Sequence, residues 1–474
     1  MSADQQSRPS PPSQGGAIQP PACTGYGALS AQQGRQAGRE PYRTDPSDAT
    51  DDRIRQGGSL AKANPAFPAT RQCQDVFWAA LFLLVVVGTA VGAVMLTSCL
   101  QEHWKNQADD APDVPRKTPD PTHLASQELQ PLLAAGSIGV AASVVAALAF
   151  FGLLAAAPTC AVWTALLFKP AVMIAIGSIL LVVSPAQTGL AGSVLIGVGL
   201  FELVIIFCCL WKHIPFVIMV VDCVSQVVTS NPSMMGVSFL GSVLASAWVC
   251  TCMIAAAGAY LMFGDEKDKT EGSNPSAEYG FIFAYTLVFT WGAQVFHNVC
   301  HVTYCGVVGR WYHKVDEEAP VSKSLGVAFT TSFGSICFGS FMVAFVRAVE
   351  AVARKAARDA EENRNVACSI LLCIIRCVLA CIGDVLEYFN EWAYIQCAIR
   401  GTSFLDSASI TMSMLTCANA KYILQDLYID SVVFFGALFC CLAGAGAGAG
   451  ADPGAADWET ESAAVRVRAA AGAA

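Results

Sequence analysis

Four side chains with binding chemistry recur along the apolar segment 279–308. Trp291, Gln294, Asn298 and His301 follow one another at intervals of three, four and three residues. Because residues three and four apart share one face of an α-helix, the four side chains form a single stripe. An indole face attracts a cation, and amide and imidazole groups line a polar pocket. We predict that the stripe binds a substrate or gates its passage. The alternative is that it only joins helices by hydrogen bonds.

Two further ionisable side chains lie inside apolar segments. Glu202 is far from either end of the segment 190–210. A carboxylate inside a membrane is costly, so it is a candidate counter-charge or proton site, unless it simply pairs with a basic residue such as Lys169. His297 lies one turn before His301 and can carry a proton, the alternative being an inert, hydrogen-bonded histidine. Glu202 and His297 are therefore the predicted ion-coupling residues.

Motifs of catalysis are missing from the sequence. No HExxH, GxSxG or Walker loop occurs, which predicts a protein that is not an enzyme and needs no cofactor. Cys373, Cys377 and Cys381 share a helical face, but most of the 20 cysteines lie in apolar segments, where cysteine acts as a small hydrophobic residue. We predict no metal site. No basic stripe with interleaved aromatic residues occurs either, which argues against nucleic acid as a partner.

Long apolar segments must position these residues. The chain is 54% hydrophobic and only 14% charged, and a membrane-spanning helix needs about 20 mostly apolar residues. We predict an all-α polytopic integral membrane protein, a helical bundle of about nine to ten transmembrane spans. An amphipathic helix at the membrane surface is expected at 211–232. The predicted spans are 76–96, 132–157, 160–183, 190–210, 237–263, 279–308, 325–349, 366–382 and a last block that begins near Ser431.

Composition divides the chain into three parts. Residues 1–72 are rich in Pro, Gly, Ser and Gln, which predicts a disordered tail. The transmembrane domain is expected at 73–447, and a Gly/Ala-rich low-complexity tail at 448–474. Lysine and arginine precede the first span, whereas the loop after it is mainly acidic, so the positive-inside rule places the N-terminal tail in the cytoplasm. These basic residues are Arg53, Arg55, Lys62 and Arg71.

Three strings in the second half of the chain resemble, in the same order, signature segments of the choline transporter-like family. They are QVFHNVCHVTYCGVVGRWY (294–312), SFGSICFGSFMVA (332–344) and NEWAYIQCAIRGTSFLDSA (390–408). The basic-Ile-Pro start of KHIPFVIMVVDCVSQVVTSNP (212–232) is also similar to that family's helix before a span. The resemblance covers about residues 190–438.

The resemblance implies a solute carrier with ten spans, located in the plasma membrane. Its expected activity is the facilitated or proton-coupled transport of choline or a related organic cation. Two alternatives stay open. In the first, the protein is a transporter whose substrate is another small amine, such as ethanolamine. In the second, the protein is a non-transporting membrane scaffold that binds partners through its long N-terminal tail.

The C-terminal end of the chain departs from the family plan. After Ser431 the apolar block passes into GAGAGAGA, whose residues are only weakly hydrophobic, and Asp452-Pro453 stops a helix. We predict that the family's final helix is missing, and that Asp426, Tyr428 and Asp430 mark the entry to the last span. Nine spans would leave residue Ala474 outside the cell, whereas ten would return it to the cytoplasm.

Overall fold

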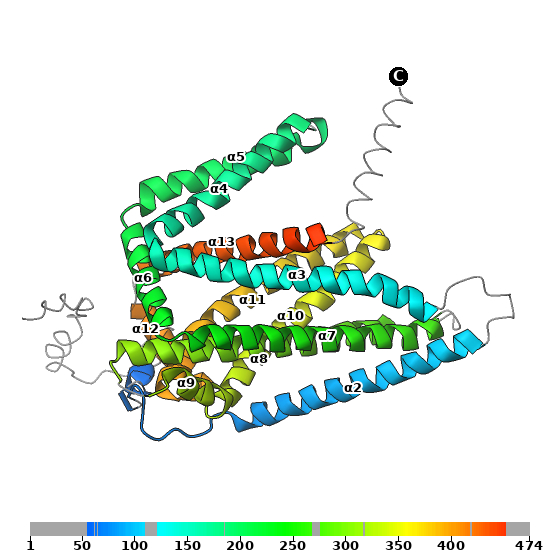
Figure 1. Cartoon of the computed structure of the whole chain (residues 1–474), viewed down its shortest axis with the longest axis horizontal. Helices are drawn as coiled ribbons and strands as arrows, with labels where there is room; N and C mark the ends of the chain where they lie inside the picture. Colours follow the sequence, from blue (N-terminus) through cyan, green and yellow to red (C-terminus); the bar gives the residue numbers. More distant parts are fainter. Residues whose placement is uncertain are drawn as a thin grey trace, which may run out of the picture. The chain divides into compact units, whose positions relative to one another are not determined.

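The computed structural model describes residues 55–60, 62–63, 65–109, 121–183, 185–267, 275–315, 318–417 and 420–451. All of them belong to one compact unit, Asp52–Ala474. Residues 1–54 and 452–474, which hold most of the two predicted tails, lie outside the described residues. The described chain is helical, as Figure 1 shows.

Within the described ranges, nine helices are long and apolar enough to cross a membrane. A helix satisfies its own backbone hydrogen bonds, which is what a segment in lipid requires. The prediction of an all-α polytopic membrane protein is confirmed. The helices are α2 (Val76–Asp109), α3 (Pro121–Ala156), α4 (Pro158–Val183), α5 (Pro185–Val204), α7 (Ser233–Lys267), α8 (Pro275–Tyr312), α10 (Phe333–Glu362), α11 (Val366–Arg400) and α13 (Ala420–Ala451).

Shorter helices lie between these spans. A π-helix, η1 (Ile205–Leu210), continues α5, and α6 (Ile214–Ser230) then begins with a proline in its first turn. Because proline has no N–H to leave unsatisfied, this is a favourable helix start. The sequence predicted α6 as a helix of its own, and its position at the membrane surface stays a prediction. The others are α9 (Pro320–Phe329) and α12 (Phe404–Cys417).

Three predicted boundaries are wrong. The span predicted at 325–349 crosses a helix break, because Leu325 belongs to α9 and α10 begins only at Phe333. The span predicted at 366–382 continues as one helix to Arg400. The last block does not dissolve at the Gly/Ala repeat, since α13 runs through the repeat to Ala451.

The Gly/Ala repeat stays helical because it packs closely on α3. A Cβ atom on Gly444 would lie 2.8 Å from the carbonyl oxygen of Gly139, and one on Gly448 would lie 3.1 Å from that of Ala135. Ser143 also donates a hydrogen bond to the carbonyl of Cys440 (3.1 Å). Small residues let two helix backbones approach within a membrane, where dispersion contacts and hydrogen bonds replace the hydrophobic effect.

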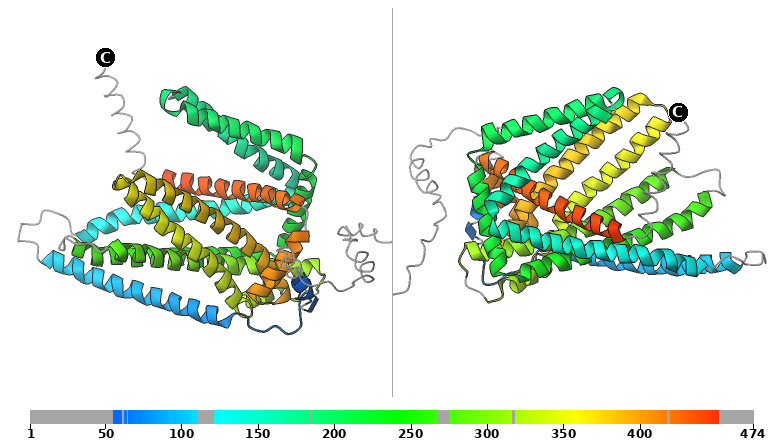
Figure 2. Two further views of the ribbon diagram at one scale, coloured as in Figure 1. Left: turned by 180° about the vertical axis from the view of Figure 1, so that it is seen from behind. Right: turned by 45° about the horizontal axis from the view of Figure 1, so that its top comes forward.

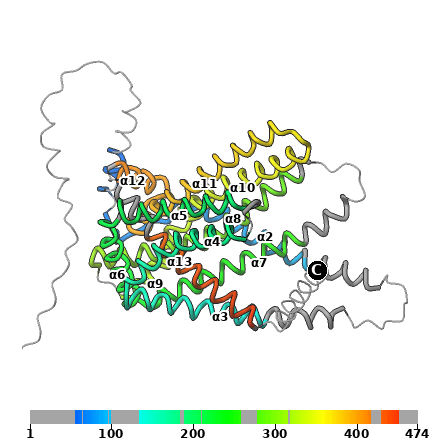
Figure 3. Tube along the Cα trace, turned by 90° about the horizontal axis from the view of Figure 1, so that it is seen from above, coloured from blue at the N-terminus to red at the C-terminus, as the bar shows by residue number. Residues whose placement is uncertain are grey.

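The described helices share two main hydrophobic cores. Figures 2 and 3 show how these helices are arranged. One core joins α2, α8, α10, α11 and α12 and includes Phe82, Trp291, Ile336 and Tyr394. The other joins α3, α4, η1, α6 and α13 and includes Val162, Leu166 and Val432. Helix α5 packs mainly along α4. Trp291, the first residue of the predicted stripe, lies in the first core, and Glu202 is on α5, which packs along α4.

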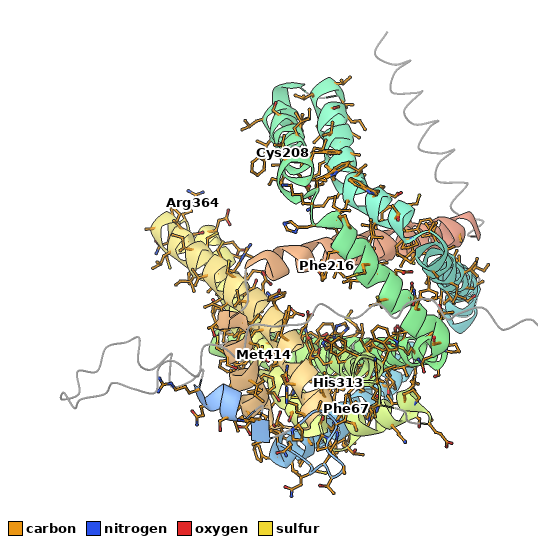
Figure 4. All side chains as sticks on the ribbon, turned by 90° about the vertical axis from the view of Figure 1, so that its left-hand side faces the viewer. Phe67, Cys208, Phe216, His313, Arg364 and Met414 are labelled. Atoms are coloured by element: carbon orange, nitrogen blue, oxygen red, sulfur yellow. The ribbon has the colours of Figure 1, made fainter. Side chains whose placement is uncertain are left out.

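An N-terminal strap, residues 65–75, closes one end of the first core. The guanidinium of Arg71 donates to the carbonyls of Ala398 (2.8 Å) and Ile399 (3.1 Å), which are at the C-terminal end of α11 and have no partner within the helix. Asp75 accepts hydrogen bonds from the hydroxyl of Ser335 (2.6 Å) and from the backbone N–H of Phe404 (2.9 Å). In Figure 4 Phe67 of the strap lies beside His313, with 5.9 Å between the ring centroids.

Candidate functional site

The stripe on α8 faces α10 and α11, two of the helices that pack against it. Trp291 is 3% exposed and Asn298 is 5% exposed, so this face of the helix is turned away from the surroundings. There is no room for a Cβ atom at Gly339 on α10, because the ring of Tyr394 on α11 lies against this glycine. The small residues at 334–340 thus allow the close helix approach that their type predicts.

Asn298 lies at the centre of a buried hydrogen-bond network. Its amide nitrogen donates to the hydroxyl of Ser340 (3.0 Å) and, at 3.4 Å, to the amide oxygen of Gln294. The hydroxyl of Ser340 lies 3.4 Å from that of Tyr394, which donates to the carbonyl of Ile336 (3.1 Å). Because buried polar groups need partners, this network fixes the three helices to one another.

Gln294 extends the network to a carboxylate. Its amide nitrogen donates to Oε1 of Glu387 on α11 (2.7 Å), while Oε2 of Glu387 accepts from Arg347 on α10 (3.3 Å). Glu387 lies about 20 Å from the C-terminal end of the 35-residue helix α11, at the rise of ~1.5 Å per residue. A charged group therefore meets the predicted stripe far from either helix end.

Glu387 belongs to a charge cluster that consists of Arg347, Glu350, Arg354, Asp384 and Glu387. Arg347 contacts Asp384 (2.6 Å) as well as Glu350 (3.5 Å), and Arg354 pairs with Glu350 (2.7 Å). Three carboxylates and two guanidinium groups leave a formal excess of one negative charge. The side chain of Glu350 is 8% exposed, that of Glu387 is 38% exposed and that of Asp384 is 70% exposed. The cluster is therefore buried at Glu350 and open at its other two carboxylates.

The two ends of the stripe are bound to protein groups. The indole N–H of Trp291 donates to the carbonyl of Cys337 (2.9 Å), and its ring packs edge to face with Phe82 (5.3 Å) and Phe341 (5.2 Å). The Nε2 atom of His301 lies 3.2 Å from the carbonyl of Glu391. For Trp291 these contacts favour the packing alternative over a cation contact.

The two predicted ion-coupling residues do not join this network. Glu202 on α5 pairs with Lys169 on α4 (2.9 Å), which is the pairing that the sequence left open as an alternative. The pair lies next to Pro170, where Gly199 allows close contact with α4. His297 is on α8, one turn before His301, but its side chain is exposed.

Sequence reasoning missed Arg347, Asp384 and Glu387. The eighth span was predicted to end at Ile382, so both acids were left outside the membrane. Arg347 lay inside a predicted span, and an intramembrane charge is itself a signal for function. A basic residue there requires an acidic partner, and Asp384 and Glu387, three residues apart on the next helix, were available to supply it.

Other candidate sites carry less chemistry. A hollow of about 480 Å³ lies between the turn that joins α6 to α7 and the start of α9, and none of the six predicted site residues lines it. Cys373, Cys377 and Cys381 are exposed on α11. No group of three potential metal ligands occurs among the residues that the structure describes.

Comparison with known proteins shows that the helices of the network lie within the match to one family. Residues 194–451, which contain α8, α10 and α11, match the family described as plasma-membrane choline transporter. Relatives named Protein PNS1 occur in Yarrowia lipolytica (28% identical over 250 residues), Kluyveromyces lactis (30% over 246) and Gibberella zeae (26% over 265). The alignments cover 50%, 48% and 54% of this chain and 44%, 44% and 48% of the relatives. This chain thus spans about half the length of the curated relatives it matches. The family match extends over more than half of the chain, which belongs to the plasma-membrane choline transporter family.

Proposed function

We propose that this protein carries choline or a related small organic cation across a membrane, with Glu387 as the counter-charge of the bound cation. The observation that carries the proposal is the charge cluster, which has one formal negative charge in excess and is tied to the α8 stripe through Gln294. Family membership supports a choline transporter-like membrane protein, and the cluster supports a monovalent cation as its cargo.

The charge balance explains why a cation would enter this site. An uncompensated carboxylate inside a membrane is costly, and a bound monovalent cation restores neutrality to the cluster. A quaternary ammonium group has no N–H to donate, so it requires opposite charge and aromatic faces and makes no directional hydrogen bonds. Glu387 retains acceptor capacity, because a carboxylate has about four lone-pair sites and here accepts one bond on each oxygen.

Transport is either facilitated or proton-coupled, and the candidate proton carriers are those predicted from the sequence. Glu202, with its partner Lys169, and the exposed His297 are ionisable side chains outside the charge cluster. Uptake driven by an imposed pH difference distinguishes the two modes. Loss of that drive in Glu202→Gln or His297→Gln, with uptake down the choline gradient retained, would identify the coupling residue.

In this proposal the N-terminal tail lies in the cytoplasm and the protein resides in the plasma membrane. Lys212, Lys314 and Lys323 each follow an even number of candidate spans among the described residues, so they lie on the same side of the membrane as the N-terminal tail, and the positive-inside rule assigns this side to the cytoplasm. At the other end of α10, Lys355 is neutralised by Glu278 (3.3 Å) and Asp359 (2.8 Å). These ion pairs explain how basic residues of α10 can face outward.

Labelled-choline uptake into proteoliposomes that contain the purified chain tests the function. We expect saturable uptake above that of empty vesicles, and inhibition by excess unlabelled choline. If ethanolamine inhibits more strongly than choline, the substrate is the other small amine. The scaffold alternative gains support if correctly folded protein shows no uptake of either compound.

A further inference from the structure

Arg347 occupies a slot on α11 that has the shape and charge to hold a cation. Its guanidinium lies between Asp384 (2.6 Å) and Glu387 (3.3 Å), which are three residues apart on the same face of the helix. Gly383 lies beneath it, since a Cβ atom there would be 3.0 Å from the central guanidinium carbon. The absence of a side chain at residue 383 thus makes room for a flat cationic group.

The contacts of Arg347 are unequal. The bond to Asp384 is short, whereas the contact with Oε2 of Glu387 is 0.7 Å longer. Arg347 also lies 3.5 Å from Glu350, so its charge is divided among three carboxylates. The same Nη2 atom makes both contacts and carries two hydrogens, so it can leave Glu387 while Asp384 still holds it.

We propose that Arg347 is a tethered internal cation that competes with the transported cation for Glu387. The proposal rests on the proposed function, in which Glu387 binds the substrate. When the site is empty, the guanidinium covers Oε2 of Glu387. When an organic cation binds, Arg347 remains with Asp384 and Glu387 turns to the substrate.

Such competition has a use in a transport cycle. Removing one partner from a buried ion pair leaves an uncompensated charge, which is strongly unfavourable. A carrier whose substrate leaves a bare carboxylate would therefore release it slowly. Arg347 supplies the replacement charge at the moment of release. The cost is a weaker apparent affinity, because binding is reduced by the fraction of molecules in which Glu387 is not available.

The test is to measure KM and kcat for choline uptake in proteoliposomes, together with choline binding to the purified full chain. Arg347→Gln removes the competing charge but keeps a side chain that can donate to Asp384. We expect KM and the dissociation constant to fall about tenfold if Glu387 is available in about one molecule in ten of the wild type. The kcat value should fall as well, because release becomes slow.

Asp384→Asn should have the opposite effect on KM. Loss of the anchoring carboxylate leaves Arg347 to pair more fully with Glu387, so the KM for choline rises. Opposite shifts from two residues that contact each other are not expected of a purely structural ion pair, whose loss on either side would only lower the amount of folded protein.

Arg354→Gln separates competition from net charge. Arg354 contributes the same charge to the cluster but contacts Glu350 and not Glu387. We expect a smaller decrease in KM than for Arg347→Gln. Equal decreases in the two variants would show that net charge alone acts, and would overturn the proposal. An unchanged or raised KM in Arg347→Gln would overturn it too. If Arg347→Gln does not fold, the double variant Arg347→Gln/Asp384→Asn replaces it, since it removes both members of the ion pair and still frees Glu387, and a KM equal to that of the wild type would contradict competition.

These outcomes differ from a failure of the proposed function. If Glu387→Gln transports choline as well as the wild type, Glu387 is not the cation site and both proposals fall. If Glu387→Gln loses uptake while Arg347→Gln leaves KM unchanged, the cation site stands and only the competition is excluded.

Discussion

At the scale of single residues, Gln294 and Asn298 perform different tasks although they are one turn apart. Asn298 is buried and bonded to Ser340, which fixes α8 to α10. Gln294 orients one oxygen of the more exposed Glu387. The stripe recognised from its spacing therefore combines a structural member with a member that reaches the charge cluster.

Gln294→Leu and Asn298→Leu should separate these tasks. The Gln294 variant leaves Glu387 without its orienting donor, so we expect the KM for choline to rise about tenfold, as for loss of a charged hydrogen bond worth ~1.5 kcal/mol. Asn298→Leu should instead lower the stability of the purified protein by ~1–3 kcal/mol with KM within about twofold, because it leaves the Ser340 hydroxyl without its donor. Thermal unfolding and uptake measured on the same samples check both; interchanged effects would refute the assignment.

Substitutions of Trp291 distinguish a packing role of its ring from a role in cation binding. Its ring lies between Phe82 and Phe341, so Trp291→Ala should create a cavity and destabilise the protein by ~3–5 kcal/mol, and Trp291→Phe by clearly less. The folded fraction of Trp291→Phe should keep a KM close to that of the wild type. A stable Trp291→Ala protein with a KM raised about tenfold or more would restore the cation–π role predicted from the sequence.

At the scale of elements, the hydrophobic pattern of the sequence was enough to identify the nine candidate spans of the described residues, because about 20 consecutive apolar residues are a strong signal. The errors in the predicted helix boundaries arose where contacts with neighbouring helices determine the extent of a helix. The part of α11 beyond Ile382 carries Asp384 and Glu387, which become compatible with a span only when Arg347 on α10 faces them. The spacing of the residues was enough to predict the stripe on α8. The residues that contact the stripe depend on which helices pack together.

The Gly/Ala repeat of α13 illustrates the same dependence. Its residues are weakly hydrophobic by themselves, yet Gly444 lies against Gly139 and Ser143 of α3. Gly444→Leu should separate the two helices and lower the thermal stability by ~1–3 kcal/mol, as overpacking does. Gly446 provides the matched control, because a Cβ atom added there would meet no neighbouring helix within 4 Å, and Gly446→Leu should leave stability nearly unchanged. Equal effects of the two substitutions would argue against the observed α3–α13 contact.

At the scale of the whole molecule, three spans (α7, α8 and α10) separate the turn at 211–213 from the turn at 363–365. These two turns must therefore lie on opposite sides of a membrane. With the N-terminal tail in the cytoplasm, an epitope inserted after Arg364 should bind antibody on intact cells, whereas one inserted after Lys212 should bind only after permeabilisation. Antibody access to both sites on intact cells would contradict the number of spans between them.

In the proposed function the carboxylate of Glu387, on α11, binds the transported cation. The most direct test is labelled-choline uptake into proteoliposomes by Glu387→Gln, with Asp222→Asn as a control acid on α6, where it accepts a hydrogen bond from Gln226 (3.0 Å) away from the cluster. Glu387→Gln removes the proposed counter-charge, and a contact to a charged group is worth ~1.5–3 kcal/mol, so we expect kcat/KM to fall about 10- to 100-fold in Glu387→Gln and to remain near the wild-type value in Asp222→Asn. Undiminished uptake by folded Glu387→Gln would contradict the claim.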